Sequence, residues 1–228
     1  MGKRMKWLLV AVVTVVLGIF LIPEAYAYFT KRSYESEAVT DTEIPENYDV
    51  ATFAGGCFWC MEPPFEKLAG VDEVVSGYTG GEEVNPSYEE VASGETSHLE
   101  AVQVYFDPSV ISYEDLLKVF WRQINPTDDE GQFIDRGYQY TTGVFYHSED
   151  QRTAAENSKS ALEKTERYEG EIVTPIKEAQ KFYKAEEYHQ DYYKENEWRY
   201  DYYRGNSGRD DYLNEIWGED RKLDLPQK

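Results

Sequence analysis

The sequence predicts an α+β fold: a two-layer sandwich with helices on one ferredoxin-like mixed sheet, preceded by an N-terminal signal or anchor segment. Short segments with apolar side chains at every second position alternate with segments of helical spacing. Their order is β-α-β-β-α-β with an added helix and strand, which is typical of this architecture. The 228 residues suffice for one domain with a full core and extra segments at both ends.

The first strand is predicted at Asp49–Ala54, where two glycines end it. A helix should follow and reach about Leu68. Because Pro63 and Pro64 cannot lie deep inside a helix, we expect its regular part to begin near Met61.

The remaining elements follow from the same patterns. Ser112 and Ser148 each precede a segment of helical spacing, as N-cap serines do, and the second of these helices should reach about Tyr168. Further strands are predicted at Val71–Tyr78, Glu100–Phe106, Tyr140–Tyr146 and Glu171–Ile176.

Polar stretches separate these elements. Residues 82–97 and 125–137 are predicted to be long loops, and loops of this length in a compact domain are commonly functional. From Ala179 onward the spacing of aromatic residues favours an amphipathic helix packed across the domain. We therefore place the folded domain at 48–204 and a C-terminal tail, for which the sequence predicts no structure, at 205–228.

The N-terminus has the features of a targeting segment. Basic Gly2–Lys6 precedes the uncharged, mostly apolar Trp7–Ile22, and Ala25–Ala27 resembles a small-x-small cleavage site. Residues 1–27 are thus either a cleaved signal peptide or a membrane anchor with its apolar part at 7–22, and 28–47 form a polar linker. Either alternative predicts that the bulk of the chain is extracytoplasmic: periplasmic, secreted or anchored to the membrane.

The overall charge argues against one class of partner. The formal net charge is −21, and no basic cluster follows the first few residues. Such a surface repels phosphates, so we expect no binding to nucleic acid.

The two cysteines, Cys57 and Cys60, have a C-x-x-C spacing that admits three interpretations. They are too close to staple distant elements, so a structural role would be that of small buried side chains. Zinc needs four ligands, whereas the pair supplies two and the three histidines have no paired spacing. Redox chemistry suits the spacing better than either.

Cys57 follows Gly55-Gly56, where the first strand passes into the first helix. Unpaired N–H groups and the helix dipole favour negative charge at such a junction, so we expect a lowered pKa for the Cys57 thiol. The glycines allow a sharp turn and leave the sulfur open to a substrate. This arrangement would activate a nucleophilic cysteine without a histidine.

A series of motifs in a fixed order extends this interpretation over most of the domain. The motifs are Gly56-Cys57-Phe58-Trp59, Gly77-Tyr78-Thr79-Gly80-Gly81, Asn85-Pro86-Ser87-Tyr88, Ser93-Gly94, His98-Leu99-Glu100, Tyr105-Phe106-Asp107-Pro108, Asp135-Arg136-Gly137-Tyr138-Gln139-Tyr140 and Ala185-Glu186-Glu187-Tyr188-His189-Gln190. With them the chain, from about Val50 to Tyr193, resembles the peptide-methionine sulfoxide reductases of the A type. One departure is Cys60, where the common pattern has glycine, while the C-terminal tail lacks the resolving cysteines that many relatives carry.

The resemblance implies reduction of the S epimer of methionine sulfoxide, protein-bound or free, through a Cys57 sulfenic acid. Cys60 is then the only internal thiol able to resolve it as a disulfide, which a thioredoxin-like reductant would recycle. The resemblance also implies roles for Glu100 as proton donor, Tyr88 and Tyr140 as hydroxyl donors to the sulfoxide oxygen, Asp135 as polar partner of Cys57 or a site water, and Phe58 and Trp59 as an apolar pocket. Neither a metal nor another cofactor is expected.

Two other functions remain open at this point. A general thiol–disulfide oxidoreductase would use the cysteine pair on protein disulfides and would have no need of Glu100, Tyr88 and Tyr140. A membrane-tethered binding module would use the cysteines for metal and would lose its fold with a chelator.

Overall fold

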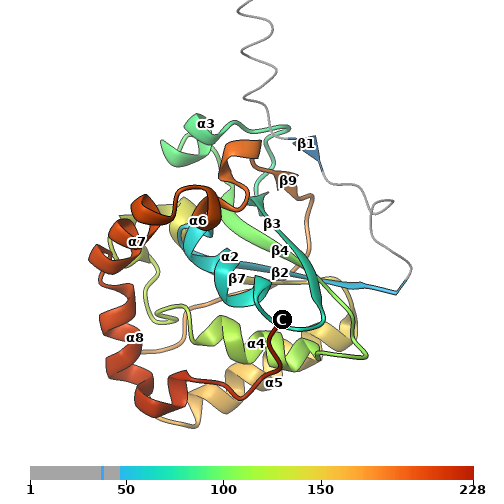
Figure 1. Ribbon diagram of the computed structural model, residues 1–228, viewed down its shortest axis with the longest axis vertical. Coiled ribbons are helices and arrows are strands. Elements are labelled where there is room, and N and C mark those ends of the chain that lie inside the picture. The colour runs from blue at the N-terminus through green and yellow to red at the C-terminus, as the bar shows by residue number, and fades with distance from the viewer. Residues whose placement is uncertain (1–36, 39–46) are drawn as a thin grey trace, which may run out of the picture. The chain divides into compact units, whose positions relative to one another are not determined.

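The structure, a computed structural model, describes residues 37–38 and 47–228 (Figure 1). The predicted signal or anchor at 1–27, with its apolar stretch at 7–22, lies outside the described residues, as does nearly all of the predicted linker at 28–47. In the described part of the chain, no helix combines the length and apolar character needed to cross a membrane.

A mixed sheet forms the centre of the fold, with its described strands in the order β1-β9-β3-β4-β2-β7-β8. Neighbouring strands pair antiparallel, except that β7 and β8 run parallel. The strands are β1 (Glu37–Ala38), β2 (Asp49–Gly55), β3 (Val71–Thr79), β4 (Leu99–Phe106), β7 (Thr142–Tyr146), β8 (Ile176–Glu178) and β9 (Tyr183–Lys184). Strands β5 (Gly131–Gln132) and β6 (Asp135–Arg136) pair separately.

Helices occupy the predicted positions between the central strands, so the predicted mixed α+β fold is confirmed (Figure 1). The α-helices are α2 (Phe58–Glu66), α3 (Tyr88–Ala92), α4 (Tyr113–Trp121), α5 (Glu149–Glu163), α6 (Tyr192–Glu195), α7 (Glu197–Asn206) and α8 (Arg209–Trp217). Short 3-10 turns are η2 (Tyr138–Tyr140), η3 (Glu187–His189) and η4 (Gly218–Arg221). The side chains of Ser112 and Ser148 cap α4 and α5 as predicted, although α5 ends at Glu163 rather than near Tyr168.

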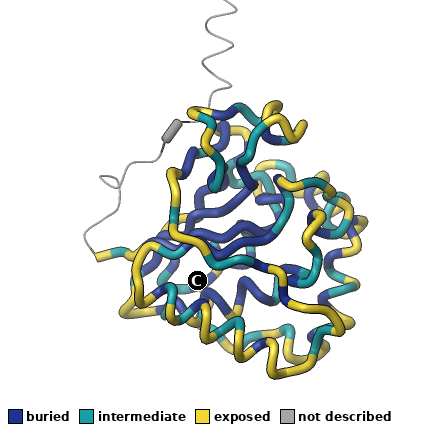
Figure 2. The backbone as a smooth tube through the Cα atoms, turned by 180° about the vertical axis from the view of Figure 1, so that it is seen from behind, coloured by how far each residue is buried: buried dark blue, intermediate teal, exposed yellow. Residues whose placement is uncertain are grey.

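The two faces of the sheet bury different sets of side chains. On one face Phe53 of β2 stacks between Phe65 of α2 and Phe120 of α4, with ring centroids 5.3 and 5.0 Å away. On the other face Ala54 and its neighbours pack against Phe182. The central strands are accordingly buried along most of their length (Figure 2).

Helix α2 begins at Phe58, three residues earlier than predicted, and contains both Pro63 and Pro64. A proline at position 64 supplies no N–H for the carbonyl of Cys60. Arg204 Nη1 donates to that carbonyl at 3.0 Å instead. The helix therefore tolerates the proline through a partner that lies far away in the sequence.

The last predicted strand is displaced. Residues 171–175 were expected in it, but they bind a neighbouring loop, since Val173 N–H donates to Pro126 O at 2.9 Å. The strand that does form, β8, pairs with β7 only from Ile176 onward.

The helix predicted from Ala179 is also wrong over its first part. Residues Tyr183–Lys184 pair with β3 as β9, because the edge of β3 offers unpaired backbone groups, and α-helix begins only at Tyr192. Residues 82–97 and 125–137, predicted to be loops, contain α3 and the β5–β6 pair. Beyond residue 205, where the sequence predicts no structure, the chain forms α8.

Candidate active site

The turn between β2 and α2 requires glycine at position 56. Gly56 has a φ of +81°, a conformation that L side chains rarely adopt. A Cβ atom there would lie 2.7 Å from Gln132 Cβ and 2.9 Å from Arg209 Nη2. The turn is thus packed closely on both sides, and it places Cys57 at the N-cap of α2.

Both cysteines are free thiols and both are buried. Cys57 keeps 7% of its surface exposed, whereas Cys60 keeps none. Their side chains are hydrogen-bonded to each other. Cys57 is therefore the sulfur that a substrate can approach.

The predicted lowering of the Cys57 pKa is wrong. Burial raises the pKa of Cys57 well above its ordinary value, and the hydrogen bond with Cys60 and the charge of Glu100 raise it further. The N–H group expected to stabilise a Cys57 thiolate, that of Phe58, instead donates to Glu100 Oε2 at 3.0 Å. The helix N-terminus therefore serves the carboxyl group rather than the thiol.

Cys60 has the lower pKa of the pair, about 6. The hydrogen bond with Cys57 is the main cause, and the positive charges of Arg209 and Arg204 add to it against the effect of burial. The hydrogen bond and the two arginines thus favour a negative charge on Cys60 over one on Cys57.

Glu100 lies on β4 with 1% of its surface exposed. Burial raises the pKa of its carboxyl group to about 8, although the hydrogen bond from Phe58 N–H opposes this shift. Glu100 is consequently protonated near neutral pH and is held in place by the first backbone N–H of α2.

Tyr88 and Tyr140 provide neutral hydroxyl groups beside the cysteine and the carboxyl group. Burial raises the pKa of Tyr88 to about 12, and burial also raises the pKa of Tyr140; Glu100 and Cys57 add to both shifts. The first turn of α3 is fixed because Tyr88 N–H donates to Glu186 Oε1 at 2.9 Å. Both phenols therefore remain hydrogen-bond donors over the whole neutral range.

Asp135, on β6, completes the set of predicted polar residues. Burial raises the pKa of its carboxyl group, and the hydroxyl of Tyr203 donates to its Oδ2 at 2.5 Å. The negative charge of Asp135 raises the pKa of Cys57, so the two groups share one site.

The aromatic pair after Cys57 differs in exposure. Phe58 is buried, with its ring 5.0 Å from that of His189. Trp59 is half-buried, stacks on Tyr192 at a centroid distance of 3.7 Å, and donates from Nε1 to His189 Nδ1 at 3.2 Å. Both therefore border the site, but Phe58 is largely a core residue.

Several residues near the site, all from the C-terminal third of the chain, were not predicted from the sequence. Glu186 and His189 stand in a quoted motif to which no role was given, so a signal for them existed. Tyr203 and Arg204 on α7, and Arg209 at the start of α8, approach the site without any motif that the sequence reasoning used.

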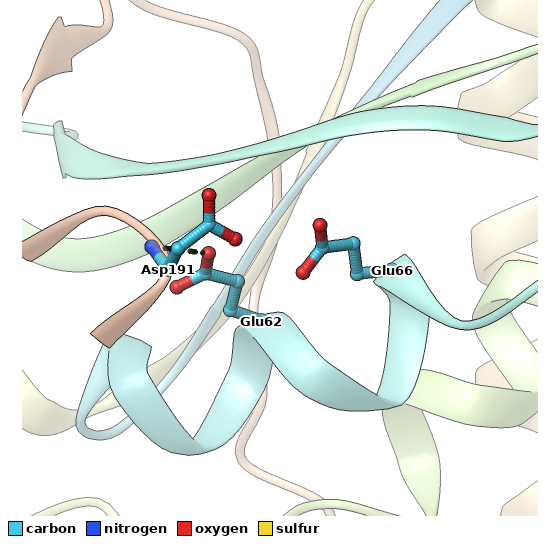
Figure 3. A group of neighbouring side chains, drawn as sticks. All are labelled: Glu62, Glu66 and Asp191. Carbon is cyan, nitrogen blue, oxygen red and sulfur yellow. Dashed lines mark hydrogen bonds between the residues drawn. The ribbon is translucent and has the colours of Figure 1, made fainter. Parts of the chain in front are cut away.

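Glu62, Glu66 and Asp191 form an acidic cluster, with ligand atoms within 4.8 Å of one another (Figure 3). The ammonium group of Lys194 already lies among them, 2.7 Å from Asp191 Oδ1 and bonded to Glu66. Glu62 accepts from Asp191 N–H at 2.8 Å, as the dashed line in Figure 3 marks. The cluster thus joins α2 to the start of α6, with a lysine as its cation.

A hydrogen-bonded cysteine pair, a protonated carboxyl group and neutral phenols, all at one strand–helix junction, define a thiol oxidoreductase. Residues 49–221 match the family model described as peptide methionine sulfoxide reductase. The chain belongs to this family, and it is an oxidoreductase of the peptide methionine sulfoxide reductase type.

Individual relatives agree with the family match. The chain is 56% identical over 146 residues to the peptide methionine sulfoxide reductase MsrA of Listeria monocytogenes, an alignment that covers 64% of this chain and 82% of the relative. It is 55% identical over 148 residues to the MsrA of Bacillus licheniformis, covering 65% and 82%. Among solved structures, reduced Mxr1 from Saccharomyces cerevisiae gives a TM-score of 0.61 at 31% identity, covering 70% of this chain and 90% of that one. Methionine sulfoxide reductase A of Corynebacterium diphtheriae gives 0.60 at 27% identity, covering 67% and 77%.

Proposed function

We propose that this chain reduces the S epimer of methionine sulfoxide, in proteins and as the free amino acid, and cycles through a Cys57–Cys60 disulfide. The observation that carries the proposal is the buried Glu100, whose pKa of about 8 keeps its carboxyl group protonated beside Cys57. A sulfoxide oxygen leaves sulfur readily only after protonation, so the reaction needs such an acid.

The first step transfers oxygen from the substrate to Cys57. The Cys57 thiol passes its proton to the Cys60 thiolate and attacks the sulfoxide sulfur while Glu100 protonates the oxygen. The oxygen then moves to Cys57 as the thioether leaves, so the cysteine sulfur loses two electrons and the substrate sulfur gains them. Cys60 passes the proton that it received from Cys57 to the Glu100 carboxylate, and the enzyme is left with a Cys57 sulfenic acid and a Cys60 thiolate.

The second step closes the disulfide. The Cys60 thiolate attacks the Cys57 sulfur, an S–S bond forms, and the S–O bond breaks with its electron pair on oxygen. Glu100 supplies the proton that turns the departing hydroxide into water. A thioredoxin-like dithiol then reduces the disulfide by exchange.

The remaining site residues take supporting roles in this proposal. The hydroxyl groups of Tyr88 and Tyr140 donate to the sulfoxide oxygen, and Asp135 holds a polar group next to Cys57. Phe58 and Trp59 form the apolar wall for the methyl and thioether part of the substrate. The raised pKa values of both tyrosines support donation from neutral phenols.

A general thiol–disulfide oxidoreductase is the less favoured alternative. That function would need the cysteine pair but not a neutral Glu100 flanked by Tyr88 and Tyr140. Membership of the reductase family also argues against it.

We also propose that the protein acts outside the cytoplasm, with 1–27 as a signal peptide or membrane anchor. The basic and apolar N-terminal sequence supports this location. Cell fractionation with an antibody against the chain tests it, and recovery of the whole pool from the cytoplasm would refute it.

We also propose that the core of the domain is ferredoxin-like, a description that the strand order β3-β4-β2-β7 supports.

The experiment that tests the function combines two measurements on the reduced enzyme. The enzyme is mixed with the S epimer of methionine sulfoxide in the absence of reductant, and released methionine and protein mass are recorded. We expect one methionine per enzyme and the loss of two hydrogens from the protein. Release of no methionine, with insulin disulfides reduced at an ordinary rate, would favour the alternative.

A further inference from the structure

We propose that Arg209, with Arg204 in support, is a positioning residue that provides a fixed positive charge for Cys60 and so keeps this cysteine ready to resolve the Cys57 sulfenic acid. The inference rests on the proposed function and deepens it. Arg204 lies on α7, at the end of the predicted domain, and Arg209 begins α8, in the part of the chain for which the sequence predicts only a tail.

Arg209 is a buried cation that makes no close ion pair among the described residues, although its charge acts from farther away on Asp135. It keeps 1% of its surface exposed, and its guanidinium donates only to neutral groups, notably Gly55 O at 3.1 Å and Gln123 O at 2.5 Å. Its Nε has no hydrogen-bond partner, and no carboxylate of the described residues lies within 4.0 Å of it. A buried charge is costly unless an opposite charge lies near, so an anion is expected beside it.

The guanidinium contacts residues on both sides of the cysteine pair. It binds the carbonyl that ends β2, and its Nη1 is 3.7 Å from Met61 Sδ, one residue after Cys60. A Cβ on Gly56 would come within 2.9 Å of its Nη2. The charge is therefore fixed at the first turn of α2, where the Cys60 side chain is completely buried.

Two acidic groups feel the positive charge of Arg209, namely the Cys60 thiol and the Asp135 carboxyl group. The titratable and charged groups that act on it or are acted on by it are Cys57, Glu100, Asp135, Tyr200, Tyr203, Arg204 and Arg209. Glu100 is protonated near neutral pH, and the hydrogen bond from the Tyr203 hydroxyl lowers the pKa of Asp135 more than the charge of Arg209 does. The tyrosines are neutral, which leaves the two arginines as the countercharges of a Cys60 thiolate.

Arg204 approaches Cys60 from its backbone side. Its Nη1 donates to Cys60 O at 3.0 Å, and its Nη2 is 2.9 Å from Asp210 Oδ1. Because Asp210 neutralises part of this charge, we assign Arg204 the smaller effect. The C-terminal helices thus supply positive charge that supports disulfide formation by Cys60, although these helices contain no cysteine.

The chain offers a clean test because Cys57→Ser leaves Cys60 as its single thiol. The ionisation of Cys60 is followed by carbon NMR of isotopically labelled cysteine, which is independent of solvent access and of tyrosine absorbance. In this background Arg209→Met should raise the pKa of Cys60 by about one to two units. Arg209→Lys keeps the positive charge, so the pKa of Cys60 should stay close to its value with arginine. Arg199→Met, which changes an exposed arginine on α7, should leave it unchanged.

A kinetic measurement in the two-cysteine enzyme separates this role from a structural one. After one turnover with the S sulfoxide, Arg209→Met should close the disulfide about tenfold more slowly near neutral pH, and the deficit should shrink as pH rises because more Cys60 is ionised. The methionine released should remain one per enzyme. Failure of the unaltered enzyme to release methionine would instead refute the proposed function.

An unchanged Cys60 pKa in folded Arg209→Met, or an equal shift in Arg199→Met, would overturn the proposal. If Arg209→Met does not fold, as judged by circular dichroism, Arg204→Met in the Cys57→Ser background must still raise the pKa of Cys60. No shift in that variant would likewise overturn it.

Discussion

Glu100 should control the pH dependence of the first turnover. Its carboxyl group has a pKa of about 8, raised by burial, so the proton that it donates is present below that pH and is lost as pH rises through it. The rate of methionine release should therefore fall about tenfold per unit above pH 8. On the acid side, protonation of Cys60 near pH 6 removes the base that accepts the Cys57 proton. We expect the highest rate between these two values.

The variant Glu100→Gln measures how much Glu100 contributes to the rate of the first turnover. The amide oxygen of glutamine can still accept the hydrogen bond from Phe58 N–H, so the turn and the helix should form as before. Glutamine cannot transfer a proton to the sulfoxide oxygen, and loss of a general acid costs about 10²- to 10⁴-fold in rate. That loss corresponds to about 3–5 kcal/mol of activation free energy. The fall in rate above pH 8 should also disappear, because the group that causes it is gone.

The assay is rapid quenching of a single turnover, with methionine measured by chromatography. Glu62→Gln is a matched control, because Glu62 is also a buried glutamate with a pKa of about 8. It bonds to Ser76 and to Asp191 N–H rather than to the cysteine turn, so its substitution should leave the rate unchanged. A Glu100→Gln enzyme with an unaltered rate, or with the alkaline fall intact, would refute the reasoning.

Four further outcomes follow from the same geometry. Tyr88→Phe and Tyr140→Phe should each slow the single turnover by about tenfold to 100-fold, because each removes a neutral donor; an unchanged double variant would contradict this. Cys60→Ser should release one methionine and then retain one added oxygen by mass, and normal cycling with a dithiol protein would show that Cys60 is not the resolver. Gly56→Ala should lower the melting temperature by several degrees, since a side chain at this φ costs about 1–2 kcal/mol before any clash, and an unchanged melting curve would oppose the assignment of strain. The folded chain holds Glu62 protonated up to about pH 8, whereas the unfolded chain ionises it above its ordinary value, so stability should decline as pH rises from 5 to 8. Glu62→Gln should reduce that decline by on the order of 3 kcal/mol in denaturant unfolding, and an identical decline in both proteins would refute the assignment.

The fold could be predicted where its signals are local. Strand β2 alternates between side chains for its two faces, and Ser112 and Ser148 cap their helices within three residues. The start of α2 could not be predicted this way, because Pro64 is tolerated through Arg204, which lies on a different helix. Strand β9 likewise could not be predicted from its local sequence, because it forms by pairing with the unpaired backbone groups at the edge of β3.

In the candidate site, too, features with a local sequence signal could be predicted, and features that depend on distant contacts could not. Its predicted polar residues, including Glu100 and Asp135, do lie within electrostatic reach of Cys57, because the motifs that contain them come together at one site. The ionisation of the pair could not be predicted. The helix N-terminus alone favours a charged Cys57, but Glu100 takes the Phe58 N–H, and Arg209 places its charge on the side of Cys60.

This reversal suits a two-step reaction better than a permanently ionised nucleophile would. A Cys57 thiolate at rest would add a negative charge beside Glu100, which burial keeps neutral, and it would be the more accessible of the two thiols to oxidants. With the charge held on the fully buried Cys60, the pair presents a neutral thiol until a sulfoxide draws the proton away. The same thiolate is then in place, five residues after the end of β2, when the sulfenic acid has to be resolved. Nucleophile and resolver therefore share a proton within the first turn of α2, and Glu100 supplies the acid from β4. The arginines of α7 and α8 add to the hydrogen bond that favours negative charge on Cys60.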